Sequence, residues 1–389
     1  MDFTITPEQE AFRRSVHEWA SAVVAPGAAD RDKEGRWDPE VWRSFGAQGL
    51  AGLPVPEEHG GAGASVVDCC LANEAIGEGG HDGGFNLSLG AHWVIGTVPI
   101  WLHGTPEQQA RYLPRLCSGE WIGAWASTEP EAGSDAGAIR TTAVREGPGR
   151  AGGWLINGTK MFITNGPIAQ LCTVLAVTDP DAGPGRGVSA FLVETDNPGF
   201  AVGRELDKMG CRSSPTAEIV LTDCRVPGDA LLGVEGEALW RIAFECFDWE
   251  RTVMIAGSIG GMQATLDASV AYAKERRQFG KPIASFQAVA HKLAEMKINL
   301  ETCRTAVYRA AWLKQQGLPH MVEASIAKTL VGDLAVRNAL EAIQIHGGYG
   351  YMREFTPERA LRDAKLASIG GGTTEIQKMI ISRALLGDG

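Results

Sequence analysis

The chain has 389 residues, of which 44% are hydrophobic and 21% are charged, and its formal net charge is -11. A negative charge argues against nucleic acid and anionic membranes as partners, since both attract basic proteins. No apolar run approaches the ~20 residues that span a bilayer, and the length predicts two or three domains. The N-terminus lacks a basic segment and an apolar stretch, and the eight cysteines have no metal-binding spacing. We therefore expect a cytoplasmic protein with reduced thiols and no metal.

Residues 1–120 predict a helical domain. Thr6-Pro7-Glu8-Gln9 and Thr105-Pro106-Glu107-Gln108 each combine an N-cap threonine, a proline at the first helical position and a glutamine three residues after the cap. Each therefore predicts a helix start. Segments 39–47 and 65–79 between them also have helical spacing.

Residues 121–229 predict a β domain, because short runs of β-branched and aromatic residues alternate with turn-forming residues. The runs include Trp154–Asn157, Lys160–Thr164, Thr173–Val177 and Val188–Val193. Turn-formers such as Asn157-Gly158 separate them at hairpin-like intervals, which favours an antiparallel barrel or sandwich. No strand–helix alternation occurs, so a Rossmann sheet is disfavoured.

Residues 230–389 predict a bundle of four helices at about 236–277, 285–314, 320–345 and 374–386. Four long helices in succession are typical of such bundles. The expected fold class is therefore α+β, with an N-terminal helical domain, a middle antiparallel β domain and a C-terminal four-helix bundle.

Two motifs carry weak signals. Gly147–Gly152 matches GxGxxG, but a strand-like segment follows it instead of a helix, so a mobile loop is favoured over a dinucleotide site. His81, His92 and His103 recur every eleven residues without nearby carboxylate or cysteine ligands, so the spacing does not indicate a metal site.

Glu250 is the most informative acidic residue. It belongs to a small and apolar stripe at helical spacing, formed by Ala243, Phe247, Glu250, Met254, Gly257 and Gly261. Such a position removes water from the carboxylate and suits a general base. The pattern alone favours a carboxylate satisfied by a partner, because Arg251 is adjacent. Segments Trp125–Asp135 and Gln344–Gly350 can likewise be read as a turn and a helix C-cap.

Six segments taken in order resemble the acyl-CoA dehydrogenase family, and the resemblance covers essentially the whole chain. They are TEPEAGSD at 128–135, NGTKMFITN at 157–165, LDKMGCR at 206–212, ERRQFG at 275–280, QIHGGYG at 344–350 and the final glycine-rich segment. The resemblance implies three domains that enclose FAD, in a homotetramer or homodimer.

The resemblance also implies roles for particular residues. Those implied to bind FAD are Trp125, Ser127, Thr128, Gly133, Ser134, Phe162, Ile163, Thr164, Arg276, Phe279, Gln287, Gln344, Ile345, His346, Gly347, Gly348, Thr373 and Glu375. Those implied to bind the substrate are Ser134, Asp248, Trp249, Glu250, Arg251, Gly370 and Gly371.

The implied catalytic base is Glu250. The family commonly places its base in the final glycine-rich segment, where this chain has Gly371. A minority, with isovaleryl-CoA and long-chain acyl-CoA dehydrogenase-like members, places it before an arginine on the long helix, and Glu250-Arg251 matches that arrangement. The implied reaction removes an α-proton and transfers the β-hydrogen to flavin N5, which converts an acyl-CoA to a trans-2-enoyl-CoA. An electron-transfer flavoprotein is the implied acceptor.

Three alternatives stay open at this point. The substrate could be an acyl or aminoacyl group tethered to a carrier protein, since the thioester arm is the same. A flavin oxidase or monooxygenase on this fold is disfavoured by the presence of Glu250. A non-catalytic scaffold is the third alternative. The sequence does not indicate the length or branching of the acyl chain.

Overall fold

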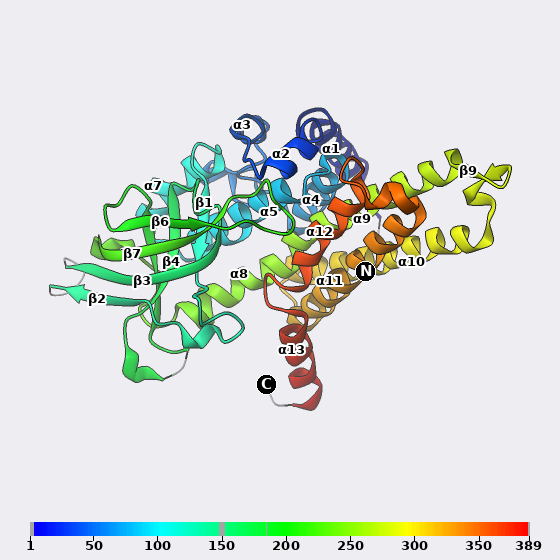
Figure 1. Cartoon of the computed structure of the whole chain (residues 1–389). Helices are drawn as coiled ribbons and strands as arrows, with labels where there is room; N and C mark the ends of the chain where they lie inside the picture. The colour runs from blue at the N-terminus through cyan, green and yellow to red at the C-terminus, as the bar shows by residue number, and fades with distance from the viewer. Residues whose placement is uncertain (1–3, 148–151, 184, 388–389) are drawn as a thin grey trace.

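The computed structural model describes residues 4–147, 152–183 and 185–387. In these residues an N-terminal set of helices is followed by a sheet and then by a C-terminal set of longer helices. Figure 1 shows the large sheet at one end of the molecule and the long C-terminal helices at the other. Among the described residues, no helix combines the length and apolar character required to cross a membrane.

The N-terminal helices begin where the caps predict. Thr6 and Thr105 each accept a hydrogen bond from the N–H three residues on, and Gln9 and Gln108 complete the two capping boxes. A π-helical segment, His92–Thr97, joins two of the helices. The helices are α1 (Pro7–Trp19), α2 (Ala28–Glu34), α3 (Pro39–Ala47), α4 (Val66–Gly80), α5 (Gly83–Ala91), α6 (Val98–His103) and α7 (Pro106–Cys117).

The middle of the described chain forms an eight-stranded sheet with the order β6-β7-β3-β2-β4-β5-β8, and β1 pairs with β4 outside this path. Most strand pairs are antiparallel, as expected, but the sheet is mixed, because β4 pairs in parallel with both β1 and β2. The strands are β1 (Gly123–Ala126), β2 (Thr142–Glu146), β3 (Gly153–Thr164), β4 (Leu171–Val177), β5 (Val188–Glu194), β6 (Phe200–Glu205), β7 (Thr216–Val226) and β8 (Leu231–Leu232).

The predicted turn at Asn157-Gly158 is wrong, because both residues lie inside the continuous strand β3. The pairing of β3 with β7 shifts register between Ile156 and Gly158, so the glycine marks a bulge. Pairing with β2 on one side and β7 on the other overrides the local turn preference. The GxGxxG segment lies largely outside the described residues, at 148–151.

The C-terminal helices lie close to their predicted ranges, but the first one is not uniform. Its helical run contains two π-helical segments, Leu239–Ala243 and Glu250–Met254, which flank α8 (Phe244–Trp249) and precede α9 (Ile255–Glu275). Short π segments in longer helices are frequent at functional sites. The other elements are the hairpin β9 (Arg277–Gln278) and β10 (Lys281–Pro282), then α10 (Gln287–Gln315), α11 (Met321–His346), α12 (Thr356–Ala364) and α13 (Thr374–Leu386). Helix α12 was not predicted.

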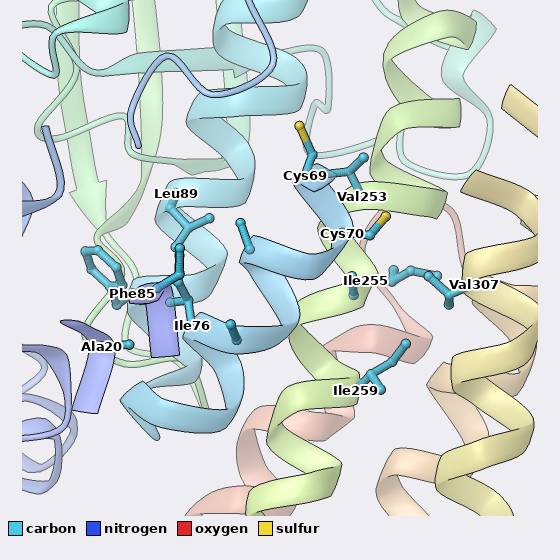
Figure 2. Close-up of a cluster of buried hydrophobic side chains, with 14 of the residues drawn as sticks. Ala20, Cys69, Cys70, Ile76, Phe85, Leu89, Val253, Ile255, Ile259 and Val307 are labelled. Atoms are coloured by element: carbon cyan, nitrogen blue, oxygen red, sulfur yellow. The ribbon is translucent and has the colours of Figure 1, made fainter. Parts of the chain in front are cut away.

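Helix α4 packs directly against α9, which joins the first and last parts of the chain into one core. A Cβ added at Gly77 would lie 2.2 Å from the carbonyl oxygen of Gly257, so the two backbones are in close contact. Figure 2 shows the side chains beside this contact, where Ile76 of α4 and Ile255 and Ile259 of α9 are buried. Burying each such side chain contributes about 1.5–3 kcal/mol. This packing fixes the position of the helical run that carries Glu250.

Candidate active site

A cavity of about 1890 Å³ lies between the sheet and the helices. All three parts of the chain line it: Leu87 comes from the N-terminal helices, Trp125 and Phe162 from the sheet region, and Glu250 and Gly371 from the C-terminal part. A single small ligand typically occupies about 300–1,000 Å³. The cavity is therefore large enough for two ligands side by side.

One face of the helical run forms a path from the surface to Glu250. Trp240, Phe244, Phe247, Glu250 and Met254 all line the cavity, at successive steps of four, three, three and four residues. Trp240 is 58% exposed and stacks on Phe244, with ring centroids 5.1 Å apart. The residues of the predicted stripe line the cavity except for Ala243, which is fully buried and does not contribute to the wall.

The Glu250 carboxylate faces the cavity without a hydrogen-bond partner or ion pair among the described residues. Burial raises the pKa of this carboxyl, while the charges of Lys328 and Arg251 act in the opposite direction. A carboxylate that makes no hydrogen bond keeps both oxygens available to accept a proton. These properties are those of a general base, and the reading of Glu250 as a carboxylate satisfied by a partner is wrong.

Gly371 lies directly against Glu250, although 121 positions separate them in the sequence (371 minus 250). A Cβ added at Gly371 would be 2.9 Å from Cδ and 3.0 Å from Oε1 of Glu250, and the residue has φ +69. A side chain at this position and Glu250 in its present orientation therefore exclude each other. Both the close contact and the left-handed backbone require glycine.

The backbone of the glycine segment is held by two side chains. Gln377 Nε2 donates to the carbonyls of Gly371 and Gly372, at 3.2 and 3.0 Å. Arg251 Nε donates to the Gly371 carbonyl at 3.4 Å. The Gly371 N–H donates to no acceptor within the described part of the chain, so it is available for a ligand.

A buried ion pair holds the loop after β1 onto β3. Lys160 is fully buried, and its Nζ lies 2.8 Å from Glu129 Oε1 and 3.2 Å from the Ser127 carbonyl. Burial alone would raise the pKa of Glu129, but Lys160 and the N–H groups of Arg140 and Thr141 hold it below its ordinary value. Sequence reasoning missed both charged residues. The feature of the sequence that could have revealed them is a lysine at an inward-facing position of a predicted strand.

The loop and strand place several predicted residues on the cavity wall. Phe162 is 65% exposed and has φ 62, and the buried indole N–H of Trp125 has no partner among the described residues. The predicted residues that line this cavity are Trp125, Ser127, Thr128, Gly133, Ser134, Phe162, Ile163, Thr164, Glu250, Arg251, Gly370, Gly371 and Thr373.

A second cavity of about 500 Å³ lies at the far end of the helices. Arg276, Ile345, His346, Gly347 and Gly348 line it, so the structure brings these predicted residues together away from Glu250. The remaining residues predicted for this part of the ligand, Phe279, Gln287 and Gln344, are exposed and do not line the cavity.

Three further predicted site residues, Asp248, Trp249 and Glu375, also line neither cavity. Asp248 contacts His320 at 3.3 Å, and Trp249 is buried under Lys314, because the residues just before Glu250 point to the other side of the helix. Glu375 is exposed in the first turn of α13. His81, His92 and His103 do not converge, and the described residues contain no group of three side chains able to hold a metal.

Three family models match the chain. They describe the N-terminal domain (residues 6–120), the middle domain (residues 124–224) and the C-terminal domain (residues 240–386) of acyl-CoA dehydrogenases. An acyl-CoA dehydrogenase of Bacillus subtilis (strain 168) is 44% identical over 383 residues, which are 98% of this chain and 99% of the relative.

Solved structures are similar along the whole chain. Butyryl-CoA dehydrogenase from Megasphaera elsdenii has a TM-score of 0.95 and 39% identity, with 99% of this chain and 100% of that chain covered. The prolyl acyl carrier protein oxidase AnaB has a TM-score of 0.94 and 36% identity, with 98% and 100% covered. The order of the domains, the cavity that they share and these similarities together establish that the chain belongs to the acyl-CoA dehydrogenase family.

Proposed function

We propose that the protein is an FAD-dependent acyl-CoA dehydrogenase that introduces a trans double bond between Cα and Cβ of an acyl thioester. The observation that carries the proposal is the Glu250 carboxylate, which has no hydrogen-bond partner in the described part of the chain and lies against Gly371 in a cavity large enough for a cofactor and a substrate. Family membership and the similarity to butyryl-CoA dehydrogenase support the substrate class.

Glu250 removes the α-proton of the thioester. The α C–H bond breaks, its proton goes to a Glu250 oxygen, and the electron pair forms the new double bond as the β-hydrogen departs. Desolvation raises the proton affinity of this carboxylate and makes it a stronger base than an exposed glutamate. The unused N–H of Gly371 is suited to donate to the thioester oxygen as negative charge develops there.

The residues around the cavity fit the flavin of FAD. The unpartnered indole N–H of Trp125 and the exposed ring of Phe162 provide a donor and an aromatic surface, and Ser127, Thr128 and Thr164 add hydroxyl groups. Bound FAD supplies the hydride acceptor for the β-hydrogen. Structures of a relative titled "FAD complex of PigA" and "PigA with FAD and proline" support this cofactor.

We further propose that a second copy of the chain completes the FAD site. The second cavity, lined by Arg276 and His346–Gly348, is far from Glu250, and Phe279 beside it is 93% exposed. This supports binding of the adenosine portion of the FAD that belongs to the other copy. An electron-transfer flavoprotein is the proposed acceptor, which is supported by the 40% identical chain from the structure titled "Electron transferring flavoprotein of Acidaminococcus fermentans".

The E250Q variant tests the proposed base. General-base assistance typically contributes about 10²–10⁴-fold, so flavin bleaching by acyl-CoA in anaerobic stopped flow should slow by that factor while FAD stays bound. E245Q is the matched control, because Glu245 lies on the same helical run but contacts His103 outside the cavity, at 3.1 Å. Flavin bleaching in E250Q at the wild-type rate would refute the proposal.

A carrier-tethered substrate is the second candidate, and the similarity to the prolyl acyl carrier protein oxidase favours it. The two candidates differ only in the group attached to the pantetheine arm. Bleaching rates with the same acyl group on CoA and on a phosphopantetheinylated carrier protein distinguish them, and the faster donor identifies the physiological handle.

A further inference from the structure

A buried ammonium group lies in the cavity wall near Glu250. Lys328 of α11 is only 3% exposed and lines the same cavity as Glu250 and Arg251. Its Nζ donates to the carbonyl of Ala367, which is its one hydrogen bond within the described part of the chain. An ammonium carries three donors and is seldom buried without a functional or structural reason.

The bond to Ala367 positions the turn that leads into the glycine segment. Ala367 belongs to the 3-10 turn Lys365–Ser368, which ends two residues before Gly370. Gly332, one helical turn after Lys328, packs on the same turn, where an added Cβ would lie 3.1 Å from both the Ala367 oxygen and Ser368 Cα. Helix α11 therefore holds the turn at two points, and the turn determines where Gly371 meets Glu250.

The charged groups that face Glu250 come from two elements. Arg251 lies on its own helical run and is already engaged, since it donates to the Gly371 carbonyl and lies 5.4 Å over the Phe247 ring. Lys328 of α11 lines the same cavity, and its charge acts on Glu250. The glycine segment contributes no charge, and burial raises the pKa of the Cys246 thiol well above its ordinary value, so this neighbour is neutral. Lys328 is thus the positively charged group that acts on Glu250 from a helix other than its own.

Resting on the proposed function, we propose that Lys328 is a positioning residue for the base. It holds the glycine segment against Glu250, and its buried positive charge favours the ionised form of the Glu250 carboxylate. A cation stabilises the charged form of a nearby carboxylate, so its removal raises the pKa of that carboxyl. Burial lowers the pKa of Lys328 itself to about 8, partly offset by Glu250, so the field weakens in alkaline solution.

The test compares K328M, K328R and G332A by anaerobic flavin bleaching over a range of pH. Loss of the charge in K328M should move the midpoint of the acidic limb upward by about one unit, which is about a tenfold lower rate below the midpoint. K328R should keep the wild-type midpoint. G332A displaces the turn without changing the charge, and should slow bleaching with no change of midpoint.

Folding and the proposed function are checked separately. FAD content and thermal unfolding show whether each variant folds. If K328M does not fold, K328R provides the test. Arginine keeps its charge in alkaline solution, so any loss of bleaching rate that the wild type shows near pH 8 should be absent in K328R. The role of Lys328 is overturned if folded K328M keeps the acidic midpoint of the wild type, or if K328R loses bleaching rate near pH 8 as the wild type does. If E250Q in the same buffers bleaches normally, the proposed function itself has failed.

Discussion

Substitution of Gly371 by alanine tests the contact on which the site depends. The added Cβ would lie 2.9 Å from Cδ of Glu250, whereas ordinary van der Waals contact starts at 3.4 Å, so one group must move by about 0.5 Å (3.4 minus 2.9). Displacement of a reacting group by ~1 Å can cost ~10²-fold in rate. We therefore expect flavin bleaching to slow about 10-fold or more. The left-handed backbone adds about 1–2 kcal/mol of destabilisation.

Gly317 provides the matched control for this backbone strain. It has φ +65, close to the +69 of Gly371, and an added Cβ would meet nothing within 4 Å. G317A should therefore lose a similar free energy of unfolding and keep the wild-type bleaching rate. Chemical denaturation and anaerobic stopped flow measure the two quantities. If G371A and G317A bleach equally fast, the contact with Glu250 has no functional consequence and the reasoning is refuted.

Two further predictions concern buried charges. The K160M and E129Q variants each leave one member of the buried Lys160–Glu129 pair without its partner. Each should lose about 3–5 kcal/mol of unfolding free energy in urea denaturation, and the double variant should lose less than the sum of the two losses. Additive losses would contradict the pairing. Burial raises the pKa of Asp363 to about 7, opposed by a hydrogen bond from the Cys211 N–H at 2.6 Å. Because the folded pKa lies above the unfolded value, this group's contribution to stability is full below the unfolded pKa and is lost as the pH rises to about 7. D363N keeps an acceptor for Cys211 and should flatten the fall in stability over that range, and an unchanged slope would count against this origin.

Local patterns in the sequence determined most of the helices and the family. Thr6 and Thr105 begin helices because a capping box satisfies backbone groups within four residues, with no help from the rest of the chain. The periodic stripe through Glu250 is predictable because helical spacing alone places those residues on one face. The resemblance to acyl-CoA dehydrogenases depended on short motifs in a fixed order.

Only the tertiary structure decided how distant groups meet. Asn157-Gly158 favours a turn locally but forms a bulge, because two neighbouring strands pair across it. Lys160 and Glu129 form an ion pair only because the fold buries them together. Lys328 contacts the turn before the glycine segment only because helix α11 packs against that turn. Gly371 and Glu250 are each ambiguous alone. A Cβ added at Gly371 would lie 2.9 Å from Cδ of Glu250, so the glycine leaves the space that the Glu250 side chain occupies, because this close-packed region admits a single side chain.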